Sequence, residues 1–344
     1  MLSFGVTFAD VTITGSINQT FSSSKDDGIV GNIGTVTAFG DRNTATGDSY
    51  LTFAGSEDLG DGMKASFKVE PRVNISGKDS STTVGSSTNA STTTLNGLFG
   101  ANREAWIGLS GAFGTVHLGN NYTPLFLRSV APYDVNGSAN APGYLVSNIT
   151  TFNATNSIDY TAPKFIDGLG IQLNKNTGRS ATILGTTANT DAGDSMGWGI
   201  SYNAGALSAG IAGETTKNTA LTDGVQAVAA ASTTNSVKKT GYGASYNLGV
   251  AKVSINGLKA TSGSSNVNTF GYGAAVPFGA VTLNASFSNM KDKGLSNDSY
   301  TAYQIGANYA FSKRTSAYLL INNLKNTTDS HTITINSLGV VHNF

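Results

Sequence analysis

Residues 281–288 read Val281-Thr282-Leu283-Asn284-Ala285-Ser286-Phe287-Ser288 and alternate strictly between apolar and polar side chains. Successive side chains on a strand point to opposite faces, so this stretch predicts a β-strand with one apolar and one polar face. The same period of two runs through residues 11–21 and 302–309. The chain is therefore predicted to be all-β, with strands that separate two differently solvated surroundings.

The composition supports this fold class and narrows the range of partners. The 344 residues include 42 glycines, 6 prolines and 12% charged residues, about half the charged share of an ordinary soluble domain. Lys plus Arg and Asp plus Glu both number 21, so no net field favours nucleic acid as a partner. Cysteine is absent, and His117, His331 and His342 show no paired spacing, so neither a metal site nor a cofactor is expected. Asp26-Asp27 and Asp191 to Asp194 could hold calcium at loop tips, although solvated turn carboxylates are the commoner case.

The chain start and the lack of long apolar runs shape the domain prediction. No run approaches the roughly 18 apolar residues of a transmembrane helix, so a membrane role would have to use strands. Residues 1–9 contain a short apolar stretch without a basic start, and we interpret them as a signal-peptide remnant or an artificial start. Residues 10–344 are expected to form a single β-barrel domain.

The connections between strand patterns alternate between short and long. The long polar segments are residues 22–47, 72–101, 120–154, 178–194 and 216–237. Tight turns on one side and long loops on the other are typical of a membrane β-barrel, with the turns in the periplasm. We predict sixteen antiparallel strands, which places both chain ends on the periplasmic side, and a bulge in the last strand after His331. The predicted strands begin near residues 10, 48, 63, 102, 114, 154, 169, 195, 207, 238, 250, 268, 280, 299, 313 and 331.

Several motifs spread over the whole chain resemble the general trimeric outer-membrane porins of β-proteobacteria. The motifs are Asp10-Val11-Thr12-Ile13-Thr14-Gly15, Gly55-Ser56-Glu57-Asp58-Leu59-Gly60-Asp61-Gly62, Asn102-Arg103-Glu104-Ala105-Trp106-Ile107-Gly108-Leu109, Asn156-Ser157-Ile158, Ser312-Lys313-Arg314-Thr315 and Gly339-Val340-Val341-His342-Asn343-Phe344. The resemblance implies a homotrimer in the Gram-negative outer membrane, in contact with membrane lipid and lipopolysaccharide. It also implies a water-filled channel for small hydrophilic solutes and ions. Phe344 is expected to be the signal that the outer-membrane assembly machinery recognises.

The resemblance also implies where the pore narrows. The third long loop, about residues 120–154, is expected to fold into the lumen and to face charged residues of the barrel wall. Arg103 occupies the position of a wall arginine, whereas Tyr50 and Asn120 stand where arginine is common in the family. Strand parity puts Lys68 and Glu70 on the lumenal face. Arg72 and Arg128 are further candidate basic residues, and Asp134 is the acidic candidate on the loop. We therefore expect a constriction with less charge than usual and modest ion selectivity.

Other readings remain open at the level of the sequence. A substrate-specific channel would use lumenal aromatic residues, and an adhesive surface β-protein would share the alternating pattern. An enzyme is not expected, because no Ser-His-acid arrangement, cysteine nucleophile or carboxylate pair is identifiable. Gly241-Tyr242-Gly243 and Gly271-Tyr272-Gly273 lie within strand patterns and precede no helix, which argues against a phosphate loop.

Overall fold

A computed structural model describes most of the chain as one antiparallel sheet. The described residues are 10–27, 35–40, 42–43, 47–75, 80–84, 91–95, 99–136, 150–177, 193–217, 236–294 and 297–344. The predicted chain start, residues 1–9, and residues 137–149 of the predicted constriction loop lie outside them. The main sheet has 17 strands; β2 pairs only with β1, and the other sixteen form the ring.

The ring closes because β1 pairs with both the second and the last strand of the barrel. Residues Asp10–Ser16 of β1 pair with β5, and residues Ser16–Asp26 pair with β21. Closure gives each of the sixteen ring strands a hydrogen-bonded neighbour on both sides, as a sheet in lipid requires. The barrel strands are β1 Asp10–Asp26, β5 Tyr50–Gly60, β6 Met63–Val73, β9 Phe99–Gly111, β10 Gly114–Tyr122, β11 Asn153–Thr161, β12 Leu169–Asn176, β13 Ser195–Ala204, β14 Leu207–Thr216, β15 Val237–Asn247, β16 Lys252–Ser262, β17 Ser265–Phe278, β18 Val281–Lys293, β19 Ser299–Ala310, β20 Thr315–Asn326 and β21 Thr332–Asn343.

Five short strands lie within the first two long connections. They form no part of the closed ring, although β2 extends the sheet beside the second half of β1. The short strands are β2 Thr35–Gly40, β3 Arg42–Asn43, β4 Gly47–Asp48, β7 Ser80–Val84 and, pairing with β7, β8 Ser91–Leu95. Parts of the predicted loops at residues 22–47 and 72–101 are thus strand, and β1 continues to Asp26.

The alternation in the sequence matches the two faces of the barrel wall. In β18, Leu283 is 46% exposed and Asn284 is 5% exposed. Leu283 points outward, and Asn284 points into the barrel. Aromatic side chains next to the short turns, among them Phe113, Phe278 and Phe311, are exposed. These faces agree with an apolar outer band and an aromatic belt at one rim.

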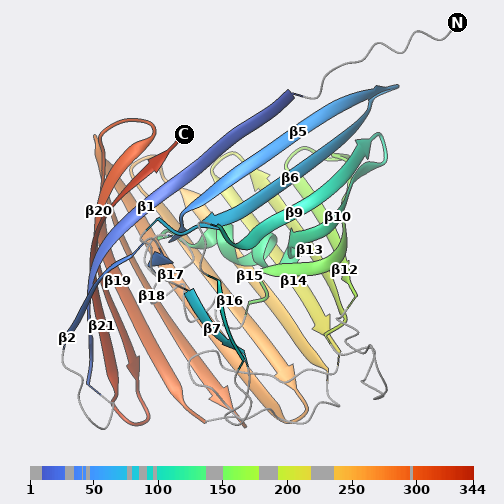
Figure 1. The fold of residues 1–344 in the computed structure, drawn as a ribbon. Helices are drawn as coiled ribbons and strands as arrows, with labels where there is room; N and C mark the ends of the chain where they lie inside the picture. Colours follow the sequence, from blue (N-terminus) through green and yellow to red (C-terminus); the bar gives the residue numbers. More distant parts are fainter. Residues whose placement is uncertain are drawn as a thin grey trace, which may run out of the picture.

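The two rims differ as the sequence predicts. The tight turns, such as Gly60–Met63 and Gly111–Gly114, lie at the rim where β1 starts and β21 ends (Figure 1). Backbone hydrogen bonds link the two ends there: Gly15 N–H donates to the Phe344 carbonyl at 3.0 Å, and Phe344 N–H donates to the Gly15 carbonyl at 3.1 Å. Both ends of the barrel therefore meet at the short-turn rim.

The predicted bulge in the last strand is wrong. β21 pairs in one unbroken register with β20, from Thr315↔His342 to Lys325↔Thr332, and with β1. The change of apolar parity along β21 instead reflects apolar side chains on the inner face, because Ile333 and Ile335 are partly buried while Leu338 is 56% exposed. The change of pattern therefore reflects which face carries the apolar side chains, and the backbone register does not shift.

The segment after β10 enters the barrel and forms two short helical turns. They are the π-helical turn η1, Phe126–Val130, and the 3₁₀ turn η2, Ala131–Tyr133. Figure 1 shows this coiled segment inside the ring of strands, and both turns contact inner-wall strands of β13–β16. Among the described residues, no helix is long and apolar enough to cross a membrane.

Candidate functional site: a constriction inside the barrel

The inserted segment packs on the inner wall through apolar side chains and against glycines. Leu125, Phe126 and Val130 form one buried cluster with inward residues of the wall, including Ala212 and Leu258. The burial of these side chains removes apolar surface from the lumen and holds the segment against β14–β16. The predicted inward fold of the loop is therefore observed for its first part, residues 123–136.

Glycines on the inner face make this close approach possible. A Cβ added at Gly210 would collide with the carbonyl oxygen of Arg128, and one added at Gly243 would collide with the ring of Tyr133. A Cβ at Gly241 would collide with the Ser129 hydroxyl. Gly241 and Gly243 are two residues apart on one strand, so they share the inner face. Gly241-Tyr242-Gly243 is thus a place where the inserted segment approaches the wall closely.

Arg128 points from the inserted segment into the wall. Its Nε donates to Gln172 Oε1 at 3.1 Å, and its Nη1 donates to Ser201 Oγ at 3.2 Å. Gln172 in turn donates to Asp159 Oδ2 at 2.8 Å, so a buried carboxylate lies behind the neutral contacts. Arg128 therefore fastens the segment to β12 and β13.

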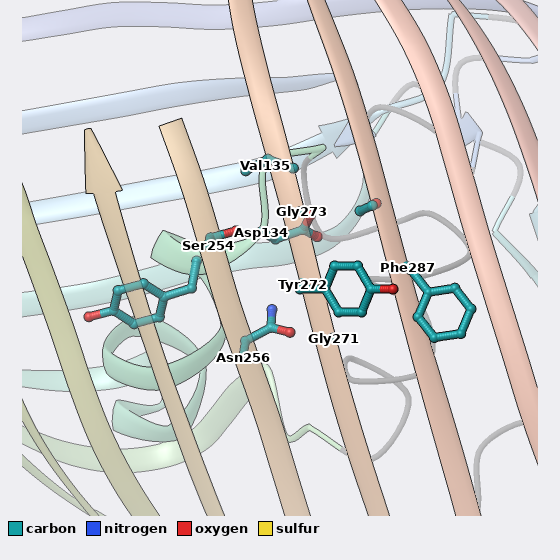
Figure 2. A pocket seen from close by; sticks show the side chains of 10 residues that line it. Asp134, Val135, Ser254, Asn256, Gly271, Tyr272, Gly273 and Phe287 are labelled. Atoms are coloured by element: carbon teal, nitrogen blue, oxygen red, sulfur yellow. The ribbon is translucent and has the colours of Figure 1, made fainter. Parts of the chain in front are cut away.

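Asp134 also lies between the inserted segment and the wall. Its Oδ1 accepts the backbone N–H of Asn136 at 2.9 Å, and its Oδ2 is buried without a hydrogen-bond partner. Figure 2 shows Asp134 beside Ser254 and Asn256 of β16 and the glycines of β17. The inserted segment lies outside the membrane-spanning strands, and burial raises the pKa of the Asp134 carboxyl. The acidic residue predicted on the loop is therefore within a small pocket on the β16–β18 side.

The opposite part of the wall carries a compact group of charged residues, here called the wall cluster: Asp48, Lys68, Glu70, Arg72, Arg103 and Glu104. Lys68 Nζ lies 3.0 Å from Glu70 Oε2 and also contacts Glu104. Arg103 Nε lies 3.3 Å from Glu70 Oε1, and Arg72 Nε lies 2.6 Å from Asp48 Oδ2. Three cations thus face three carboxylates within one group.

Arg103 reaches this group through a β-bulge. β6 pairs Glu70 with Glu104 but the next residue, Pro71, with Asn102, so Arg103 is an additional residue on β9. A bulge of this kind redirects a side chain. It explains how two neighbouring residues reach the same group, with Arg103 contacting Glu70 and Glu104 contacting Lys68. Strand parity alone would place Arg103 and Glu104 on opposite faces.

Polar and aromatic contacts fix the position of Arg103. The guanidinium lies 4.0 Å over the ring of Tyr50, and Nε donates to the Tyr122 hydroxyl at 3.1 Å. The amide of Asn120 donates to the Arg103 carbonyl at 3.4 Å, and Asn153 donates to the same carbonyl. Tyr50 and Asn120, the two positions where the resemblance led us to expect arginine, therefore both contact Arg103.

The structure thus divides the predicted site residues into two groups. Arg103, Lys68, Glu70, Arg72, Tyr50 and Asn120 come together on one side, whereas Arg128 and Asp134 belong to the inserted segment. Sequence reasoning missed Asp48, Glu104 and Tyr122. Glu104 directly follows Arg103, and only the bulge, which no single-sequence pattern announces, puts both in the same group.

A second charged group, separate from the wall cluster, holds the returning part of the loop. Lys239 Nζ donates to Thr151 Oγ1 at 2.8 Å, and Thr151 Oγ1 donates to Glu214 Oε1 at 2.5 Å. Lys239 Nζ and Glu214 Oε1 are 3.9 Å apart. Both ends of the inserted segment are therefore anchored to the inner wall, one by Arg128 and the other by this group.

Comparison with known proteins agrees with this geometry. The chain is 28% identical over 335 residues to the major outer membrane protein P.IB of Neisseria meningitidis, covering 90% of this chain and 86% of the relative. It is 28% identical over 321 residues to the outer membrane porin protein 32 of Delftia acidovorans, covering 88% and 81%. An anion-selective porin from Comamonas acidovorans has the same fold, with a TM-score of 0.75, 24% identity and coverage of 98% and 100%.

A family model described as Gram-negative porin matches residues 2–329, nearly the whole chain. The closed barrel, the apolar outer face and the inserted segment are the features that such a channel requires. The chain therefore belongs to the Gram-negative porin family, and it is a passive diffusion channel of the outer membrane.

Proposed function

We propose that this porin is a weakly ion-selective channel that passes small neutral solutes readily, because its constriction is close to electrically balanced. The constriction is formed by the inserted loop, about residues 120–154, and by the wall cluster. Arg103, Lys68, Glu70, Arg72, Tyr50 and Asn120 line its wall side. Arg128 and Asp134 take part on the loop side by holding the loop in place.

The pairing within the wall cluster is the observation that carries this proposal. Lys68, Arg72 and Arg103 each lie within 3.3 Å of a carboxylate oxygen. A solute passing the cluster therefore meets nearly cancelling fields from charges of both signs, and salt screens what remains over about 10 Å. An unpaired row of arginines would instead attract anions strongly.

The loop supports the same conclusion. Residues 120–154 contain only two charged side chains, Arg128 and Asp134. Arg128 bonds to wall side chains, and Asp134 is enclosed beside β16 and β17. Neither adds a strong charge to the open lumen. This departs from what the name of the Comamonas acidovorans structure, an anion-selective porin, would suggest by analogy.

The assembled state also belongs to the proposal. A homotrimer is supported by the family resemblance and by a fold relative from Vibrio cholerae described as a trimer form, with a TM-score of 0.65 and 10% identity. Residues 10–344 are proposed to form the barrel domain, with Phe344 as the signal for assembly. The surroundings are proposed to be lipid and lipopolysaccharide, and no catalytic role is proposed.

Liposome swelling tests solute passage. Proteoliposomes containing the folded protein are diluted into iso-osmotic solutions of neutral, anionic and cationic solutes of similar size. We expect swelling rates that fall with solute size and differ little with charge. Strong preference for one charge would contradict the balanced constriction. Rates that saturate and are blocked by one competitor would instead favour a substrate-specific channel.

A further inference from the structure

Three metal-binding side chains converge where the barrel closes, at the rim opposite the chain ends. Asp26 and Asp27 stand at the end of β1, and His331 immediately precedes β21. One ligand atom from each lies within 4.8 Å of the other two. His331 and Asp26 are 305 positions apart in the sequence, so the spacing of the histidines gave no sign of this cluster.

The ion pair between His331 and Asp26 involves only two of the three side chains. His331 Nε2 contacts Asp26 Oδ1, and this pair would be complete without a second carboxylate. Asp27 nevertheless brings its carboxylate to the same point. Neighbouring residues on a strand point to opposite faces, so both reach His331 only because the chain bends at Asp27.

Backbone contacts hold this bend in place. Asp27 N–H donates to the Thr332 carbonyl at 3.1 Å, and Thr332 N–H donates to Asp27 Oδ1 at 2.6 Å. The His331 N–H donates to Asp329 Oδ1 at 3.0 Å, which fixes the residue that carries the imidazole. Two carboxylates, those of Asp26 and Asp27, therefore lie close to one imidazole, and the repulsion between them favours a bound cation.

We propose that Asp26, Asp27 and His331 bind one divalent transition-metal ion of the Zn²⁺ class at the outer rim. Calcium prefers an all-oxygen set, whereas one imidazole nitrogen with carboxylate oxygens suits zinc and its neighbours. In a tetrahedral site with zinc bonds of about 2.0–2.2 Å, two ligand atoms lie roughly 3.5 Å apart. The three ligand atoms lie within 4.8 Å of one another, so small side-chain movements of roughly 1 Å would bring them into zinc geometry. The side chains are also accessible, with His331 and Asp26 side chains 26% and 21% exposed.

The proposed ion would connect the first and last strands of the barrel at its outer end. On the other rim the same two strands are joined by the hydrogen bonds between Gly15 and Phe344. A metal ion that binds only the folded barrel adds to the stability of the barrel. The site would therefore stabilise the pairing of β1 with β21, where the ring closes.

Isothermal titration of EDTA-treated folded protein with ZnCl₂ tests this proposal. The wild type is compared with His331→Gln and Asp26→Asn. The matched control is His342→Gln, because His342 lies at the other end of β21 and bonds to Thr315. The electrophoretic mobilities of heated and unheated samples are compared before titration to verify that every variant is a folded barrel.

We expect one saturable site per chain in the wild type and in His342→Gln. Removing a ligand should weaken binding by about tenfold or more in His331→Gln and Asp26→Asn. Absence of saturable binding in the wild type would overturn the proposal. Equal affinity of the wild type and His331→Gln would overturn it as well, because any bound zinc would then occupy another site.

Discussion

Glu70→Gln separates the charge of the wall cluster from its shape. Glu70 contacts Lys68 Nζ at 3.0 Å and Arg103 Nε at 3.3 Å, and its Oε2 accepts the Thr52 hydroxyl at 2.7 Å. Glutamine keeps the size and part of the hydrogen bonding. Lys68 retains Glu104 as its partner. The substitution therefore leaves about one uncompensated positive charge, next to Arg103.

The size of the effect follows from Coulomb's law. A unit charge about 6 Å from a passing ion in water is worth roughly 0.7 kcal/mol, and screening at 0.1 M salt reduces this to roughly 0.4 kcal/mol. The charge attracts anions and repels cations by that amount, so the two effects add in the permeability ratio. We expect the ratio of anion to cation permeability to rise about three- to fourfold.

The assay is the reversal potential of single channels in a planar bilayer under a KCl gradient. Glu57→Gln is the matched control. This substitution removes the same charge outside the wall cluster, because Glu57 is exposed on β5 next to the short turn. The control should keep the wild-type ratio. If Glu70→Gln also kept it, the pairing within the wall cluster would not govern selectivity.

Three further predictions concern the seam, the inserted segment and pH. Tyr318→Phe removes the hydroxyl that bonds to two side chains of β1, so the free energy of unfolding in urea titrations should fall by about 1–3 kcal/mol, while Tyr309→Phe at the exposed rim should change it little. Gly243→Val would collide with Tyr133 and displace the segment, so single-channel conductance should increase; unchanged conductance would refute the close packing. Burial raises the pKa of Asp134, so the docked segment favours the neutral carboxyl. Docking is then strongest below the ordinary pKa of about 3.9 and weakens as pH rises through the raised value, and open-channel noise should grow with pH in the wild type but not in Asp134→Asn.

The barrel could be predicted from the sequence, because each strand of a membrane barrel alternates between apolar and polar side chains. Lipid on one side and water on the other require alternation, as at Leu283 and Asn284, and tight turns end the strands at one rim. The inner face is less regular. Ile333 and Ile335 are apolar residues that face inward. In the sequence this pattern resembled a change of register, which led to the incorrect prediction of a bulge in the last strand.

The constriction was only partly readable for a different reason. Arg103 was found through the family resemblance, but its place beside Glu104 depends on a bulge opposite Pro71. The docking of the inserted segment depends on glycines two residues apart, such as Gly241 and Gly243, whose parity was visible in the sequence. The direction of Arg128 toward Gln172 and Ser201 is a tertiary result that a local pattern does not encode.

The reversal potential of the wild-type channel tests the balanced constriction most directly. Folded protein is incorporated into a planar bilayer under a KCl gradient, and the conductance steps and zero-current voltage are recorded. We predict ohmic steps and an anion-to-cation permeability ratio that differs from 1 by less than about threefold. A single net charge at the constriction would produce a larger ratio. A strongly selective channel of either sign would show that the paired charges of the wall cluster do not cancel, and would contradict the account.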